Sequence, residues 1–110
     1  MNQMTIFDVM ASSMDFRKMT DEEMIRLIGE MTGLEFRWND FFCRWIARDK
    51  ALTVMVYRDT FDTNDDRNGK EFIALDVNYR KADFGIPCES ISEAVNEIKN
   101  SKKRLKAEDR

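Results

Sequence analysis

The residues with the clearest potential for chemistry form an oxygen-rich stretch, Asp62-Thr63-Asn64-Asp65-Asp66-Arg67-Asn68-Gly69. Carboxylate and amide oxygens at alternate positions are the ligands of a calcium-binding loop. Such a loop also needs a glycine at its sixth position and a bidentate glutamate at its twelfth, where this chain has Arg67 and Ile73. Because Asn, Asp and Gly are the usual turn residues, we expect a polar hairpin loop without a metal.

The usual catalytic side chains are scarce. The chain has no histidine, which removes the commonest general base, metal ligand and member of a catalytic triad. Cys43 and Cys88 are a single distant pair, and we expect free thiols, Cys43 on a strand and Cys88 in a loop. None of the 4 glycines belongs to a phosphate-binding loop. The sequence therefore predicts a protein that is not an enzyme and needs no cofactor. Because carboxylates are plentiful, the alternative is an enzyme that uses carboxylates alone or a metal ion.

Charge divides the chain into an acidic body and a basic tail. Residues 1–98 carry 12 Lys and Arg against 19 Asp and Glu, a net charge of −7, and residues 99–110 carry 6 against 2, a net charge of +4. An acidic body suits a basic partner, such as a protein that handles nucleic acid, and it also keeps a small protein soluble. The acidic residues that we expect to contact such a partner are Asp59, Asp62, Asp65 and Asp66.

The basic tail offers a second kind of contact. Its cations could bind the phosphates of a nucleic acid, or they could complement the negative end of a helix dipole. The residues concerned are Lys99, Lys102, Lys103, Arg104 and Lys106.

The N-terminal run Gln3-Met4-Thr5-Ile6-Phe7 resembles the short peptide by which bacterial polymerases and repair proteins dock on the replication sliding clamp. The resemblance implies that Gln3 hydrogen-bonds at the cleft of the clamp while Ile6 and Phe7 fill its hydrophobic pocket. The alternative is a short helix from Thr5 to Met14 whose apolar side folds back on the core.

Two helices are marked by capping boxes. Thr20 and Glu23 predict the start of a helix that ends at Gly33, and Ser90 and Glu93 predict the start of a second helix. Between them the apolar residues alternate with period two, which predicts strands over 34–38, 41–47, 52–56 and 73–79. Their expected connections are the turns 39–40 and 48–50 and a type I′ turn at 68–69.

The elements predict an α+β fold, made of a helix, a three- or four-stranded antiparallel meander sheet and a helix, after a short N-terminal helical segment. With 110 residues, of which 43% are hydrophobic, the chain fits one domain. We place it at 20–107, between an N-terminal segment, 1–19, and a tail, 108–110. No apolar run is long enough for a membrane span or a signal peptide, so we expect a cytoplasmic protein without membrane contact.

The capped helix, the sheet and the run from Gly85 to Ala94, GIPCESISEA, resemble small accessory proteins of bacteriophages and other bacterial mobile elements. That resemblance implies a class in which some members inhibit host defence nucleases as acidic decoys. The element order is also similar to the double-stranded RNA-binding domain, whose second helix begins with basic residues. This chain has Glu89, Ser90 and Glu93 there, so the RNA-binding surface is not shared.

These features favour a non-catalytic accessory or inhibitor protein that binds a basic nucleic-acid-handling protein, or the sliding clamp. One alternative is a nucleic-acid-binding module that uses the basic tail. The other is a homodimer, suggested by a stretch that is apolar on both strand faces and rich in aromatic residues. Those residues are Phe36, Trp38, Phe41, Phe42 and Trp45.

Overall fold

The computed structural model describes residues 15–78 and 85–108, and for 106–108 it describes the helical backbone alone. It confirms the α+β class. The elements are the 3₁₀ helix η1 (Phe16–Lys18), helix α2 (Asp21–Thr32), strands β1 (Arg37–Asn39), β2 (Arg44–Asp49), β3 (Leu52–Thr60), β4 (Glu71–Val77) and β5 (Ile86–Cys88), and helix α3 (Ile91–Glu108). The helix predicted for residues 5–14 lies outside the described residues, as do Gln3, Ile6 and Phe7.

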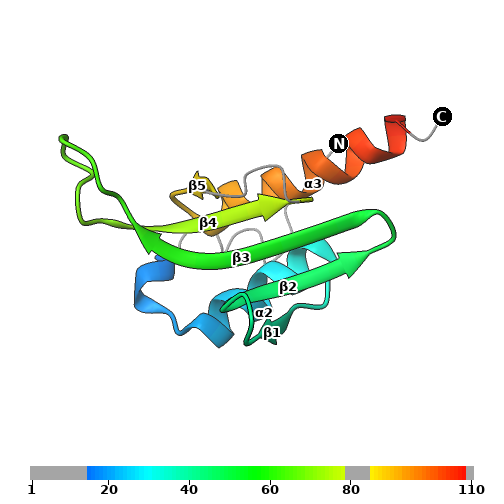
Figure 1. Cartoon of the computed structure of the whole chain (residues 1–110), viewed down its shortest axis with the longest axis horizontal. Helices are drawn as coiled ribbons and strands as arrows, with labels where there is room; N and C mark the ends of the chain where they lie inside the picture. Colours follow the sequence, from blue (N-terminus) through cyan, green and yellow to red (C-terminus); the bar gives the residue numbers. More distant parts are fainter. Residues whose placement is uncertain (1–14, 79–84, 109–110) are drawn as a thin grey trace.

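The sheet is an antiparallel meander with the strand order β1-β2-β3-β4-β5 (Figure 1). Its register aligns Val54 of β3 with Ala47 of β2 on one side and with Val77 of β4 on the other. The sheet has one strand more than predicted, because β5 pairs with β4 along Ile86–Cys88. Pro87 has no N–H to donate, and an edge strand tolerates this.

Helix α2 begins and ends where the sequence predicts. Glu23 N donates to Thr20 Oγ1 at 3.2 Å and Thr20 N donates to Glu23 Oε1 at 3.1 Å, so the reciprocal capping box is complete. The backbone N–H from Thr20 lowers the pKa of Glu23 below its usual value. At the other end Gly33 takes a left-handed conformation, φ 73°, and its N–H donates to the carbonyl of Gly29.

The two helices and one face of the sheet enclose the main core. Alternate residues of β3 and β4 point to this face, because successive side chains on a strand point to opposite sides. The fully buried members include Met24 and Ile28 of α2, Val54 and Val56 of β3, Ile73 and Leu75 of β4, and Ile91 and Ile98 of α3. The opposite face of the sheet is buried at its centre as well, at Ile46, Met55 and Ala74.

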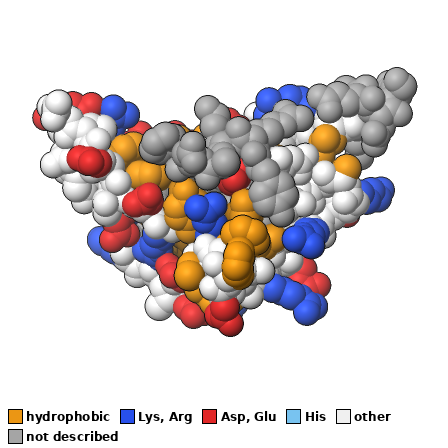
Figure 2. All heavy atoms as spheres, in the orientation of Figure 1, with side chains coloured by type: hydrophobic (Ala, Val, Ile, Leu, Met, Phe, Trp, Pro, Cys, Tyr) orange, Lys and Arg blue, Asp and Glu red, His pale blue; other side chains and the backbone are white. Residues whose placement is uncertain are grey.

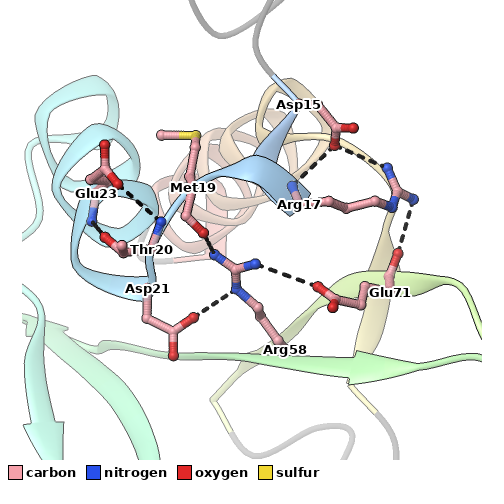
Figure 3. Close-up of polar contacts among 8 residues, drawn as sticks. All are labelled: Asp15, Arg17, Met19, Thr20, Asp21, Glu23, Arg58 and Glu71. Atoms are coloured by element: carbon pink, nitrogen blue, oxygen red, sulfur yellow. Dashed lines mark hydrogen bonds and ion pairs between the residues drawn. The ribbon is translucent and has the colours of Figure 1, made fainter.

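A largely buried arginine fastens the segment before α2 to the sheet (Figure 3). The side chain of Arg58, on β3, is 19% exposed, and its Nε lies 2.6 Å from Asp21 Oδ1. Its two terminal nitrogens reach Glu71 Oε2 and the carbonyl oxygen of Met19. Arg17 donates in turn to the carbonyl of Glu71, so the 3₁₀ helix and α2 are both tied to the β3–β4 pair.

Helix α3 is held against α2 by one of its lysines. Ser90 Oγ accepts from Glu93 N at 3.1 Å as predicted, whereas the Glu93 carboxylate accepts from the N–H of Glu89 instead of that of Ser90. Lys102 Nζ donates to the carbonyl oxygen of Thr32 at 2.6 Å. Lys102 therefore caps the C-terminus of α2, where a cation is favourable.

Candidate interaction site

The β1–β2 hairpin turns through four residues, Asp40 to Cys43, at the edge of the sheet (Figure 1). Asn39 Oδ1 accepts from Phe42 N at 2.9 Å, and Cys43 adopts a positive φ of 53°. The strand predicted over 41–47 is therefore wrong at its start, because β2 begins at Arg44. The predicted turn at 39–40 is too short for the same reason.

The turn and strand β1 together expose three large aromatic side chains. Phe41 is 88% exposed, Trp38 is 48% exposed and Phe42 is 41% exposed. The rings of Phe41 and Phe42 pack edge to face, with their centres 5.0 Å apart. Exposed apolar side chains that gather in one place mark an interaction site. We call the hairpin, residues 37–49, the aromatic hairpin.

Contacts within the aromatic hairpin orient the Trp38 ring. Trp38 Nε1 donates to Asp40 Oδ1 at 2.7 Å, and the Trp38 ring packs edge to face on Trp45, with the two ring centres 5.5 Å apart. Trp45 is itself packed against the core. The Trp38 ring is thus connected to the core through Trp45, which lowers the entropy lost when a partner binds it.

Two hollows lie near the N-terminal end of the aromatic hairpin. One has a volume of about 300 Å³ and lies beside α2, lined by residues that include Ile25, Leu34 and Phe36. The other has a volume of about 350 Å³ and is lined by Glu35, Arg37, Trp38, Asn39, Ile46 and Arg48. We call the second one the arginine hollow.

Three arginines lie on the face of the sheet away from the helices, and two of them, Arg37 and Arg48, line the arginine hollow. Arg37 lies opposite Ile46 in the β1–β2 register, and Arg44 and Arg48 lie two residues to either side of Ile46. All three therefore share one face. Figure 2 shows basic side chains over the region of β1 and β2, and acidic side chains along the projecting β3–β4 hairpin.

The predicted acidic contact residues lie at the far end of the molecule from α3's C-terminus, in and next to the β3–β4 loop (Figure 1). Asp65 is paired within the loop: its carboxylate accepts from Arg67 Nη2 at 2.8 Å, from Arg67 N at 2.9 Å and from Thr63 Oγ1 at 2.8 Å. These hydrogen bonds from Arg67 hold the pKa of Asp65 far below its usual range. Asp59, Asp62 and Asp66 are exposed.

The type I′ turn predicted at Asn68-Gly69 is wrong. Such a turn needs a positive φ at both residues, and of the two only Gly69 has one, at 80°. The chain instead closes a longer loop, in which Phe61 and Lys70 are paired by Phe61 N donating to the Lys70 carbonyl. Arg67 lies over the ring of Phe61, with its guanidinium carbon 5.1 Å from the ring centre.

The basic residues of α3 are only partly available. Lys102 is half-buried and bound to Thr32, whereas Lys99, Lys103 and Arg104 are exposed. Lys99 and Lys103 are four residues apart on one face of the helix. Lys106 lies in α3, and its side chain is not among those described.

The two cysteines are the reverse of what the sequence indicates. Cys43 is exposed in the β1–β2 turn, whereas Cys88 is buried on β5. Burial, with Glu93 and Glu97 nearby, raises the pKa of the Cys88 thiol to about 12. Cys88 is thus a core residue, and Cys43 lies on the aromatic hairpin.

Within residues 15–78 and 85–108, no group of three or more His, Cys, Asp or Glu side chains is placed to hold a metal ion. No helix in that part of the chain is both long and apolar enough to span a membrane.

Comparison of the chain with protein-family models, curated proteins and solved structures gave no match.

The sequence indicates the aromatic hairpin only as an excess of aromatic residues. Alternation cannot show that Phe41 and Phe42 occupy a turn, because two adjacent aromatic residues fit a strand equally well. The arginine hollow gave no signal either, since Arg37 and Arg48 become neighbours only through the β1–β2 register.

Proposed function

We propose that this chain is a non-catalytic accessory protein that binds another protein through its aromatic hairpin. The observation that carries the proposal is the exposure of Phe41, 88%, beside the partly exposed Phe42 and Trp38. Burying an exposed phenylalanine side chain contributes about 1.5–3 kcal/mol, so these rings supply a strong anchor to a partner with an apolar pocket.

The acidic residues of the β3–β4 loop are weaker evidence for protein binding than the aromatic hairpin. Asp65 already binds Arg67, so its charge is largely compensated within the loop. Asp62 and Asp66 are exposed and can attract a basic partner, but exposed charges contribute more to the rate of encounter than to affinity. We therefore propose that the aromatic hairpin provides most of the affinity, whereas the exposed carboxylates of the β3–β4 loop raise the rate of encounter with the partner.

Self-association is the second candidate, because the same rings could bury one another in a homodimer. β1 is an edge strand, and its free edge lies next to Phe41 and Phe42. Sedimentation velocity of the wild type and of a Phe41→Ser, Phe42→Ser variant separates the two candidates. A wild-type dimer that becomes monomeric in the variant would identify the partner as a second copy of the chain.

Affinity capture tests the main proposal. The intact protein, the Phe41→Ser, Phe42→Ser variant and an Asp62→Asn, Asp66→Asn variant are immobilised and exposed to an extract of the native cells. We expect one protein to be retained by the wild type and by the loop variant, and lost by the hairpin variant. Retention by the hairpin variant with loss by the loop variant would contradict the proposal.

A further inference from the structure

The arginine hollow joins the aromatic hairpin on the outer face of β1 and β2. Arg37 and Arg48 line it together with the Asn39 amide, and Ile46, which is almost fully buried, is also part of its lining. Arg44 is cross-strand from Asn39, next to the hollow. Glu35 is the one acidic residue among the lining residues.

The two guanidinium groups that line the hollow have either no ion-pair partner or only an exposed one within the part of the chain that the structure describes. Arg48 forms no hydrogen bond or ion pair with the part of the chain that the structure describes. Arg37 pairs with Glu35 at 3.1 Å, and both side chains are 81% exposed. Exposed ion pairs contribute little in water, so an incoming anion can replace Glu35 at small cost.

Arg44 adds a charge in a fixed position. Its guanidinium carbon lies 4.2 Å from the centre of the Tyr57 ring, the residue opposite it on β3. A cation held over an aromatic ring keeps its hydrogen-bond donors available at its edge. Arg44 does not line the hollow, but its oriented guanidinium adds positive charge to the same face of the sheet, over β3.

We propose that the arginine hollow binds carboxylate side chains of an acidic segment on the protein that docks on the aromatic hairpin. The planar donors of arginine match a carboxylate in a two-point contact, and Asn39 supplies a further donor. The inference rests on the proposed function and adds the local charge of the partner where it faces the hollow: an acidic segment next to the apolar pocket that receives the rings.

Phosphates bind arginine equally well, so a single-stranded nucleic acid is the rival ligand. Proteins of that kind stack successive bases on rings along a groove. Here Phe41 and Phe42 stand on the tip of a turn, and the ring of Tyr57 is occupied by Arg44. A projecting ring fits the pocket of a protein better than a stack of bases.

The test uses two fluorescently labelled probes, a short glutamate-rich peptide with two central leucines and an oligothymidine of equal length. Binding to the purified protein is followed by fluorescence anisotropy at low salt. We expect the wild type to bind the peptide more tightly than the oligothymidine. The variant Arg37→Gln, Arg48→Gln should bind the peptide about tenfold more weakly, since hydrogen bonds to charged groups are lost.

Two further variants sharpen the result. Glu35→Gln removes the competing carboxylate and should strengthen peptide binding. Lys99→Gln, Lys103→Gln removes two positive charges from exposed positions of α3 and should leave the affinity within about twofold.

The proposal is overturned if the wild type does not bind the peptide, if the arginine variant binds as the wild type does, or if the lysine variant loses as much affinity as the arginine variant. Tighter binding of the oligothymidine would assign the hollow to nucleic acid instead. Each of these results leaves the capture experiment with the Phe41→Ser, Phe42→Ser variant unaffected, so failure of the inference can be told apart from failure of the proposed function.

Discussion

Arg58 shows how a single residue joins two parts of the chain. Its guanidinium group contacts Asp21, Glu71 and the carbonyl of Met19 from a position that is 19% exposed. Asp21 and Glu71 are each about half exposed, so water can solvate them if the arginine is removed. The carbonyl of Met19 and the packing of the arginine stem then account for much of the stabilisation.

Replacing Arg58 with methionine should lower the free energy of unfolding by about 2 kcal/mol, because the charge-assisted hydrogen bonds are lost while the apolar stem is kept. Urea denaturation measures this change. The matched control is Arg48→Met, an exposed arginine on the next strand, which should change stability by less than about 0.5 kcal/mol. Equal effects of the two substitutions would show that the contacts of Arg58 add nothing to stability.

The two cysteines should differ sharply in reactivity. The thiolate is the reactive form, and Cys88 is buried with its pKa raised to about 12, whereas Cys43 is exposed. In the folded protein a thiol reagent should therefore modify one cysteine quickly and the other only after unfolding. Mass spectrometry of the modified protein assigns the sites, and Cys43→Ser should abolish the fast phase. A fast phase that survives in this variant would mean that β5 does not protect Cys88.

At the scale of elements, the β3–β4 loop is ordered by its own side chains. Asp65 accepts hydrogen bonds from the backbone and the guanidinium of Arg67, and these contacts lower its pKa. A carboxylate with a lowered pKa in the folded state stabilises that state at neutral pH, and the contribution is lost as the pH falls through the lowered value.

Replacing Arg67 with glutamine should therefore raise the pKa of Asp65 toward its ordinary value of 3.8. An NMR titration of the side-chain carboxyl group measures this shift directly. Lys70→Gln removes the same charge from the loop without touching Asp65, so the pKa of Asp65 should stay low in that variant. A similar rise in both variants would assign the low pKa to the general charge of the loop.

The helices and the longer strands could be predicted from sequence because their signals are local. Thr20 and Glu23 satisfy each other within one turn, and the alternation in β3 and β4 extends over several residues. Strand β5 has three residues with Pro87 at its centre, too few to show a period. The β1–β2 turn contains apolar residues where turns are usually polar, and the sequence predicts a strand there.

At the scale of the whole molecule, three exposed surfaces differ in their charge and hydrophobicity. The β3–β4 loop carries exposed Asp62 and Asp66, α3 carries exposed Lys99 and Lys103, and the aromatic hairpin combines Phe41 with Arg37 and Arg48. These three surfaces belong to different elements, so variants of one can serve as controls for the others. The hairpin alone offers both apolar anchors and charge, the combination that affinity and specificity require.

The most direct test of the hairpin as a docking surface is isothermal titration calorimetry with the protein retained by affinity capture. Phe41→Ser should weaken binding by about thirtyfold, corresponding to a lost contribution of about 2 kcal/mol from one buried ring. Asp66→Asn, an exposed substitution on the β3–β4 loop, should leave the affinity within about threefold. An unchanged affinity for Phe41→Ser would contradict the account.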